Sequence, residues 1–240
     1  MHSRFIAPTN PRTKIWRYMD FTKFLSLLED SSLYFTRSDR FEDVYEGSTP
    51  HANAEMFESV YAGTEAIHNL KVWTDLMTWT RKWTYINCWH MNKGESYAMW
   101  KLYAQTGEAI AIQSTYERLR RNLPTEANVG IVLYKDYDIE VIDDCDTFER
   151  YLHKRESFVH EQELRVVVQD LPYDGHNFDQ SEPEGPAGRS MQVDICDLIE
   201  NVFVAPTAQP WFLELVRKIL KRYGLLLKLH DSNLRKAPTF

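Results

Sequence analysis

The sequence contains few glycines, few cysteines and no long hydrophobic run. Nine glycines among 240 residues exclude a collagen-like chain and a flexible low-complexity chain. The three cysteines (Cys88, Cys145 and Cys196) are far apart, and no Cys-x-x-Cys or Cys/His pair has the spacing of a zinc site. We therefore expect reduced thiols, as in a cytoplasmic protein, and a fold that needs neither disulfides nor a bound metal.

Signals for export and membrane insertion are also missing. No apolar run approaches the roughly 18 residues of a transmembrane helix, and the start MHSRFIAPTNPR lacks the apolar segment of a secretory signal. We therefore expect a cytoplasmic protein with no membrane partner. The net charge of −7 argues against general nucleic-acid binding, which depends on neutralising phosphates. The basic stretch after Pro210 still leaves a local surface for an anionic partner open.

Several familiar catalytic motifs are absent as well. The sequence has no GxxxxGK[ST] phosphate loop, no GxGxxG fingerprint, no HExxH zinc motif and no GxSxG nucleophile elbow. Phosphate-loop enzymes, Rossmann-type oxidoreductases, zincin peptidases and α/β-hydrolases therefore all lack their signature in this chain.

Aromatic residues, in contrast, are abundant, at 13% of the chain. Five of the seven tryptophans fall close together: Trp73, Trp79, Trp83, Trp89 and Trp100. The first three belong to a stretch with helical character and are expected to fill the core. Trp89 and Trp100 flank a predicted helix start at Ser96, and we expect these two near a pocket shared with Arg17 and Glu163.

Hydrophobic periodicity predicts one α+β domain over residues 1–240, with mixed or mostly antiparallel sheets. Helices are expected at 21–30 (capped by Asp20), in a helical insertion at about 52–83, and at 97–105, 116–123, 146–158 and 211–223. Strands are expected at 33–36, 85–89, 108–113, 129–134, 163–168, 201–204 and 225–229. Residues 172–190, rich in proline, glycine and acids, are expected to form a mobile loop.

The first cluster of candidate residues lies near the N-terminus. Arg17 and Tyr18 precede the first predicted helix, where a cation can hold an anionic group. Arg37, Asp43 and Glu46 follow the first expected strand in a polar loop. The alternative is local salt bridging and loop capping, which these charges on their own favour.

The second cluster surrounds Ser96. Ser96, Met99, Trp100 and Tyr103 occupy successive turns on one side of the expected helix, with a hydroxyl at its start and an aromatic wall beyond. A helix N-terminus also favours phosphate. The alternative is that these side chains fill the core. His90 is a candidate general base, although no Ser/His/Asp order accompanies it.

The third cluster is the segment HEQELR. On a strand, Glu161, Glu163 and Arg165 share one face, because side chains alternate with a period of two. Two carboxylates beside an arginine can hold a ribose hydroxyl or act as a general base. The alternative is an exposed edge strand whose charges oppose aggregation.

Together, the clusters resemble a bacterial family, domain-of-unknown-function family 2971, along nearly the whole chain. The resemblance rests on the order and spacing of four segments: Arg17-Tyr18…Phe24-Leu25…Leu28; Leu33-Tyr34-Phe35-Thr36…Phe41-x-Asp43-x-x-Glu46; Cys88-Trp89…Met99-Trp100-x-x-Tyr103…Gly107-x-Ala109-Ile110; and Lys154…Phe158…Glu161-x-Glu163-x-Arg165. The loop reads Phe41-Glu42-Asp43 where the family more often has Asn-Asp-Pro. This resemblance by itself implies no activity.

More distantly, the chain is similar to ADP-ribosyltransferases, which have a split, mixed β fold around bound NAD. Their sites combine an Arg or His on the opening strand, a Ser or Tyr segment leading into a helix, and a later Glu, often as Glu-x-Glu. The similar residues here are Arg17 or Tyr18, then Ser96 to Tyr103, then Glu161-Gln162-Glu163. This likeness implies an enzyme that consumes NAD, such as a toxin or defence effector, with a protein or nucleic acid as acceptor.

The same resemblance implies a role for each residue. Arg17 would neutralise the NAD pyrophosphate. Glu163 would hold a ribose hydroxyl and stabilise an oxocarbenium-like transition state, while Glu161 would orient or activate the acceptor. The other residues expected to contact the nucleotide are Tyr18, Trp89, Ser96, Trp100, Tyr103 and Arg165.

Two further functions stay open. A metal-dependent nuclease or phosphodiesterase would gather Asp43, Glu46, Glu161 and Glu163 around magnesium. A noncatalytic module would use the aromatic wall to bind a nucleotide or a peptide. One cleft lined by Arg17, Trp100 and Glu163 would indicate a small-molecule site, whereas side chains that point to separate surfaces would argue against both enzyme functions.

Overall fold

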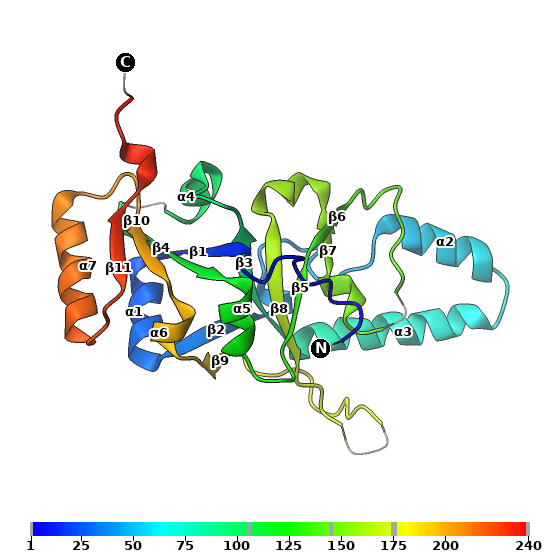
Figure 1. Cartoon of the computed structure of the whole chain (residues 1–240). Helices are drawn as coiled ribbons and strands as arrows, with labels where there is room; N and C mark the ends of the chain where they lie inside the picture. The colour runs from blue at the N-terminus through cyan, green and yellow to red at the C-terminus, as the bar shows by residue number, and fades with distance from the viewer. Residues whose placement is uncertain (1, 105–106, 145, 174–176, 239–240) are drawn as a thin grey trace.

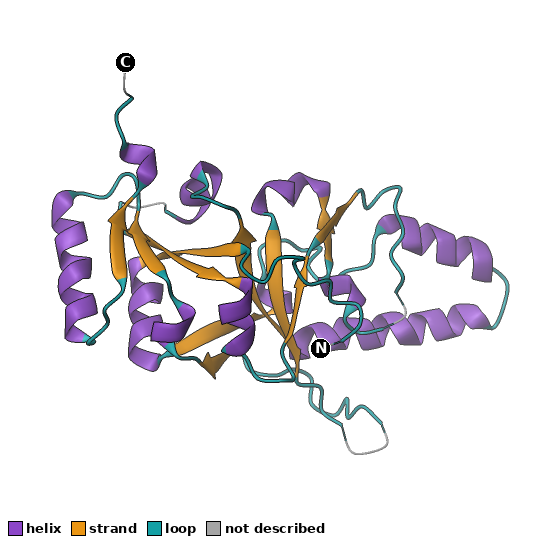
Figure 2. Ribbon diagram, viewed as in Figure 1, coloured by secondary structure: helices purple, strands orange, loops and turns teal. Residues whose placement is uncertain are grey.

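In the computed structural model, the described residues (2–104, 107–144, 146–173 and 177–238) form one mixed α+β domain. A nine-stranded mixed sheet is accompanied by a separate two-stranded sheet, with helices around them (Figures 1 and 2). The predicted α+β class is therefore confirmed. Cys145 and the expected helix end at Gln105 lie outside the described residues, whereas Cys88 and Cys196 are free thiols.

Strands and helices are interspersed along the chain. The strands of the large sheet are β1 (Lys14–Asp20), β2 (Ser32–Arg37), β3 (Thr84–Met91), β4 (Ala109–Thr115), β5 (Asn128–Ile131), β8 (Glu163–Gln169), β9 (Gly188–Gln192), β10 (Asn201–Val204) and β11 (Lys228–Asp231). The small sheet pairs β6 (Leu133–Lys135) with β7 (His153–Arg155) in parallel. The helices are α1 (Phe21–Asp30), α2 (His51–Tyr61), α3 (Ala66–Thr80), α4 (Tyr97–Tyr103), α5 (Tyr116–Arg121), α6 (Ile195–Leu198) and α7 (Pro210–Arg222).

The large sheet divides at β3. One edge of β3 pairs antiparallel with β8 along residues 84–90. The other edge pairs with two different strands, with β2 as far as Ile86 and with β1 from His90 onward. Residues 87–89 have no strand partner on that edge in the described part of the chain, so β1 and β2 leave a gap there.

The turn from β1 into α1 holds one side of this gap. Asp20 caps α1 as predicted, because its carboxylate accepts a hydrogen bond from the backbone N–H of Lys23 at 2.7 Å. The apolar stripe of α1 is buried in the main core through Phe24, Leu27 and Leu28. The cap and the buried stripe therefore hold α1 against the sheet.

Two expected elements are wrong, and two others have different bounds: the loop expected at 172–190 gives way to β9 at Gly188, and the strand expected at 225–229 begins only at Lys228. Residues 129–134 are not one strand but two, because β5 pairs with β8 whereas β6 pairs with β7. Residues 146–158 are not a helix but a short 3-10 turn, then β7, then a second 3-10 turn at Glu156–Glu161. Tertiary ion pairs override the local pattern here, since Arg150 binds buried Asp144 and Lys154 binds two carboxylates.

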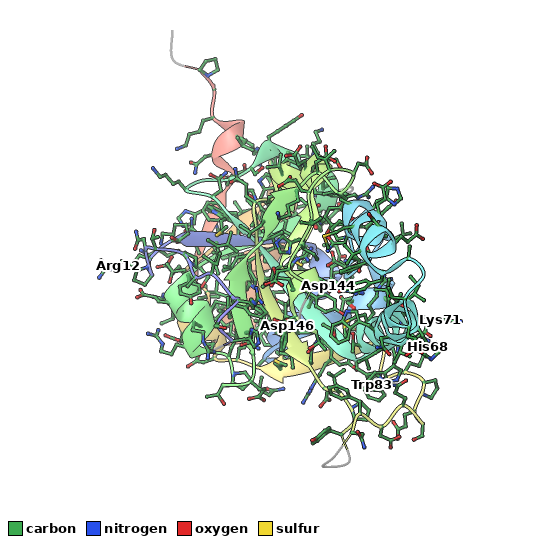
Figure 3. The ribbon with its side chains drawn as sticks, turned by 90° about the vertical axis from the view of Figure 1, so that its right-hand side faces the viewer. Arg12, His68, Lys71, Trp83, Asp144 and Asp146 are labelled. Carbon is green, nitrogen blue, oxygen red and sulfur yellow. The ribbon has the colours of Figure 1, made fainter. Side chains whose placement is uncertain are left out.

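The expected helical insertion corresponds to α2 and α3, which form an arm that projects from the sheets (Figure 1). Met77 and Trp79 are buried, whereas Trp73 is half-buried, so only part of the expected tryptophan packing is present. His68 and Lys71 project from α3 on this arm (Figure 3). Among the described helices, none has the length and apolar composition needed to cross a bilayer.

Candidate ligand-binding site at the divided sheet

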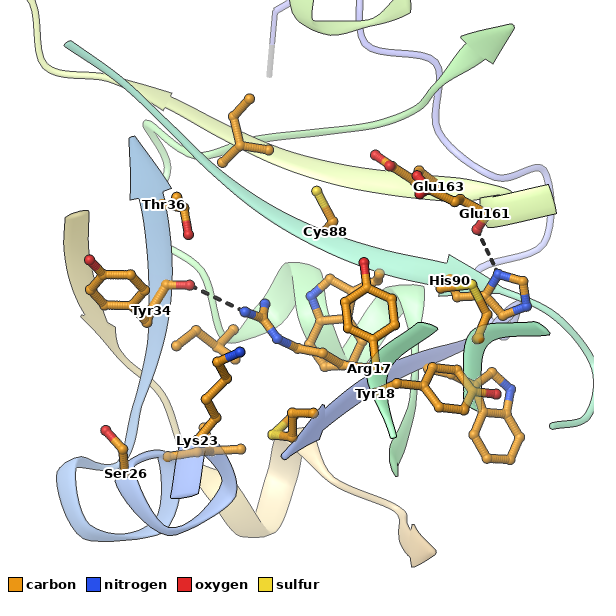
Figure 4. Close-up of a pocket in the computed structure, with 18 of the residues that line it drawn as sticks. Arg17, Tyr18, Lys23, Ser26, Tyr34, Thr36, Cys88, His90, Glu161 and Glu163 are labelled. Carbon is orange, nitrogen blue, oxygen red and sulfur yellow. Dashed lines mark hydrogen bonds between the residues drawn. The ribbon is translucent and has the colours of Figure 1, made fainter. Parts of the chain in front are cut away.

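A cavity of about 470 Å³ lies at the gap between β1 and β2 (Figure 4). Its lining comes from β1, α1, β2, β3, α4, β8 and β9, so segments far apart in the sequence converge on it. The size lies within the range of small-molecule sites, about 300–1,000 Å³. Much of the wall is apolar and aromatic, with contributions from Trp16, Leu33, Phe41, Trp89 and Met99.

Arg17 enters the cavity from the middle of β1. Its Nη2 donates a long hydrogen bond of 3.4 Å to the backbone carbonyl of Tyr34 on β2. Its Nη1 is buried and has no hydrogen-bond partner among the described residues, although Arg17 as a whole is partly exposed. Burial lowers the pKa of Arg17, and no described carboxylate is among the groups that act on it. A buried guanidinium nitrogen without a partner favours an anionic ligand, because burying a donor without an acceptor is costly.

Asn87 bridges the gap where β3 lacks a strand partner. Its Nδ2 donates to the carbonyl of Tyr34 at 2.8 Å, and its Oδ1 accepts from the indole N–H of Trp89 at 2.7 Å. These two contacts fix the wall next to Arg17. Sequence reasoning missed Asn87, although a single amide inside the apolar segment YINCW was a usable signal.

The carboxylates of Glu161 and Glu163 line the other end of the cavity. Lys154 lies between them and donates to both, with 2.8 Å from its Nζ to Glu163 Oε1. Glu161 is not on the strand as expected, because β8 begins at Glu163 and Gln162 adopts a left-handed φ of 40°. The two side chains nevertheless meet at the same ammonium group.

Arg165 lies behind Glu163 and does not line the cavity. Its Nε donates to Glu163, and its two Nη atoms donate to the two oxygens of Glu46 at 2.7 Å each. The side chain of Arg165 is fully buried. The expectation of an exposed edge strand is therefore wrong, since β8 lies between β3 and β5 and carries a buried ionic network. Arg165 holds Glu163 in place.

Burial and neighbouring charges shift the pKa values of Glu161 and Glu163 in opposite directions. Burial and the hydrogen bond with Glu163 raise the pKa of Glu161 to about 8. Burial also disfavours the charged form of Glu163, but the charges of Arg165 and Lys154 and the hydrogen bond from Glu161 outweigh it and hold the pKa of Glu163 below its ordinary value. At neutral pH the pair therefore carries one proton, which resides on Glu161.

This proton makes stability depend on pH. The folded chain raises the pKa of Glu161 from 4.5 to about 8, so its contribution is fully present below pH 4.5 and is lost as pH rises through about 8. We expect the urea midpoint of the wild type to fall more between about pH 5 and pH 8 than that of Glu161→Gln. The exposed control Glu58→Gln should keep the wild-type slope. Parallel slopes for wild type and Glu161→Gln would contradict the assignment of the proton.

The second predicted cluster is only partly in the cavity. Trp89, Met99 and Tyr103 line it, as does His90, whose Nδ1 donates to the backbone carbonyl of Glu161 at 2.6 Å; Tyr18, from the first cluster, lines it too. Burial lowers the pKa of His90, so the ring is neutral at neutral pH. Of the nine residues expected to form the site, the cavity brings together six: Arg17, Tyr18, Trp89, Tyr103, Glu161 and Glu163.

Ser96 and Trp100 support the wall from behind. Ser96 caps α4, and its backbone N–H donates to the Tyr18 hydroxyl at 2.8 Å. Trp100 is buried, packs edge-on against Tyr18 at 4.9 Å between ring centroids, and donates to Glu95 at 3.0 Å. Of the three residues that were expected to line one cleft, Arg17 and Glu163 do so, while Trp100 orients the Tyr18 ring.

The arrangement gives little support to a magnesium site. Arg165 already neutralises Glu46 and Glu163, and an ammonium group lies between Glu161 and Glu163. Asp43 binds Arg155 at 2.8 Å instead of joining this group. Among the described residues, no cluster of three or more His, Cys, Asp or Glu side chains is arranged to hold a metal ion.

Neither a protein-family model nor a curated protein matches this chain. The likeness to family 2971 and to ADP-ribosyltransferases therefore stays an interpretation of the residues that carry it. The function has to be argued from the chemistry of the cavity.

Proposed function

We propose that the protein cleaves NAD at the bond between nicotinamide and ribose and transfers ADP-ribose to an acceptor. The observation that carries this proposal is the presence in one cavity of the Arg17 guanidinium, whose Nη1 is buried without a partner, and, at the other end, the carboxylate pair Glu161 and Glu163. Such a cavity suits a ligand that is anionic at one end and gains positive charge at the other. NAD has this distribution while its glycosidic bond breaks.

The chemistry assigns different tasks to the two ends. The C1′–N bond breaks, and its electron pair leaves with nicotinamide, which becomes neutral while positive charge develops on the ribose. Glu163 stays ionised, because Lys154 and Arg165 lower its pKa, and is suited to stabilise that charge. Arg17 would pair with a phosphate group and hold the rest of the dinucleotide in place.

Glu161 is suited to proton transfer. The acceptor's hydroxyl, amine or water attacks C1′ and must lose a proton once the new bond forms. Because the pKa of Glu161 is raised to about 8, the carboxylate is ionised in a minority of molecules at neutral pH, and in those molecules it can accept this proton; that fraction grows as pH rises toward 8. Trp89 and Tyr103 would hold the planar nicotinamide or adenine ring by stacking.

The order of the elements supports the same proposal. Arg17 lies on the first strand, Ser96 starts a helix after β3, and Glu163 opens a later strand. β1 and β2 pair with different parts of the same edge of β3, and the sheet is divided between them. The order of these three segments along the chain is the one on which the resemblance to ADP-ribosyltransferases rests, and it supports the proposal.

Replacing Arg17 is expected to change stability and ligand affinity in opposite directions. We expect Arg17→Met to raise the free energy of unfolding, by about 1 kcal/mol, because it removes a buried donor without a partner, Nη1, at the cost of one long hydrogen bond to Tyr34. The same change should abolish ADP-ribose binding in calorimetric titrations. The surface control Arg222→Met should alter neither quantity. If Arg17→Met binds ADP-ribose as well as the wild type does, Arg17 is not the anion site.

A noncatalytic nucleotide-binding module is the second candidate. Both oxygens of Glu163 already accept hydrogen bonds, from Lys154 and Arg165, which also suits a purely structural carboxylate. The two functions differ in turnover. ADP-ribose binding without nicotinamide release from NAD would favour the noncatalytic module.

A further inference from the structure

Lys23 brings a second cation to the Arg17 end of the cavity. It lies on the first turn of α1, and its side chain rises toward the Arg17 guanidinium (Figure 4). Ser26 lines the cavity one turn further along α1, and Ser190 of β9 lines it as well. Two positive charges, those of Arg17 and Lys23, therefore lie at the same end of the cavity.

The acidic side chains that line the cavity are confined to the opposite end. They are Glu161 and Glu163. Asp20 binds Lys23 at 3.1 Å but is not among the lining residues, and both partners of this pair are exposed. Exposed ion pairs of this kind contribute little to stability, so Lys23 can exchange Asp20 for a ligand anion at small cost.

We infer that Arg17 and Lys23 form a two-cation subsite for a pyrophosphate group, with Lys23 as a binding residue that no part of the sequence pattern indicated. The inner guanidinium, which lacks a full set of partners, would bind one phosphate, and the outer ammonium would bind the other. Ser190 also lines the cavity and offers a hydroxyl donor, whereas the Ser26 hydroxyl already donates to Asp30 at 3.0 Å. This inference rests on the proposed function only in identifying the pyrophosphate as part of a dinucleotide.

The test is calorimetric titration of the full chain with inorganic pyrophosphate, ADP-ribose and nicotinamide riboside, which has no phosphate. The variant is Lys23→Gln, and the matched control is Lys71→Gln, an equal charge change on the exposed arm (Figure 3). We expect Lys23→Gln to weaken pyrophosphate and ADP-ribose binding about tenfold, as expected for a hydrogen bond between charged groups. Lys71→Gln should bind as the wild type does, and binding of the riboside should not differ between the proteins.

The outcomes separate this subsite from the proposed function. Equal affinity of wild type and Lys23→Gln for both phosphate compounds overturns the subsite but leaves NAD cleavage standing. Pyrophosphate binding that depends on Lys23, without ADP-ribose binding, supports the subsite and contradicts NAD as the substrate. A wild type that binds neither compound, or a loss in Lys71→Gln equal to that in Lys23→Gln, overturns the subsite.

Discussion

Glu163→Gln is expected to reduce nicotinamide release from NAD by about 10³-fold, the typical effect of losing one preorganised electrostatic group. Glu163 is the carboxylate that stays ionised, because Arg165 and Lys154 lower its pKa. The amide has nearly the same shape but no charge, so it stabilises developing positive charge much less. Binding of ADP-ribose should persist, since Arg17 and Lys23 remain in place at the other end of the cavity.

Release of nicotinamide can be followed by chromatography, with ADP-ribose titration and circular dichroism on the same preparation. Glu58→Gln, an exposed site on α2, provides the control and should retain wild-type turnover. Because Glu163 is part of a buried network, the retained ADP-ribose binding separates lost chemistry from lost folding. Wild-type turnover in a folded Glu163→Gln protein would exclude this residue as the electrostatic group.

Arg165→Met is expected to lower the free energy of unfolding by about 3–5 kcal/mol, the usual cost of leaving buried charges without their partner. The fully buried guanidinium pairs with Glu46 and Glu163 together, so its removal leaves the buried Glu46 without an ion-pair partner and Glu163 with Lys154 alone. Charge repulsion between the two carboxylates adds to the cost of desolvation. A double variant with Glu46→Gln should recover part of the loss, since it removes one of these charges.

Urea unfolding curves provide the measurement for Arg165→Met. Arg189→Met is the matched control, because Arg189 binds Asp170 at 2.8 Å in a pair whose two side chains are exposed. Such a pair is expected to contribute less than about 1 kcal/mol. Equal losses at the two positions would show that the buried network does not hold β8 and Glu163 in the way inferred here.

Elements with strong local patterns were predictable from the sequence. The helix at Phe21–Asp30 follows from its Asp20 cap and apolar stripe, and β3 follows from the apolar run that contains Trp89. The candidates Arg17, Glu161 and Glu163 were identified because charges beside apolar segments stand out. Their convergence on one cavity could be expected only through a resemblance, since spacing alone says nothing about distant segments.

The supporting residues of the site were not predictable in the same way. Glu46 and Arg165 are 119 positions apart, and their pairing depends on how β8 packs against the loop after β2. Lys154 was assigned to a helix because local periodicity ignores the carboxylates that draw this segment into β7. The division of the sheet at β3 likewise depends on pairing between strands, which no local window contains.

The most direct test of the central claim is incubation of the wild-type protein with NAD that is labelled in the nicotinamide ring. Our account predicts that free nicotinamide accumulates with time and that Glu163→Gln stops it. A second label in the adenine would identify the acceptor, either as a modified macromolecule or, if water is the acceptor, as free ADP-ribose. If the folded wild type releases no nicotinamide in the presence of cell extract as a source of acceptors, the cavity does not cleave NAD.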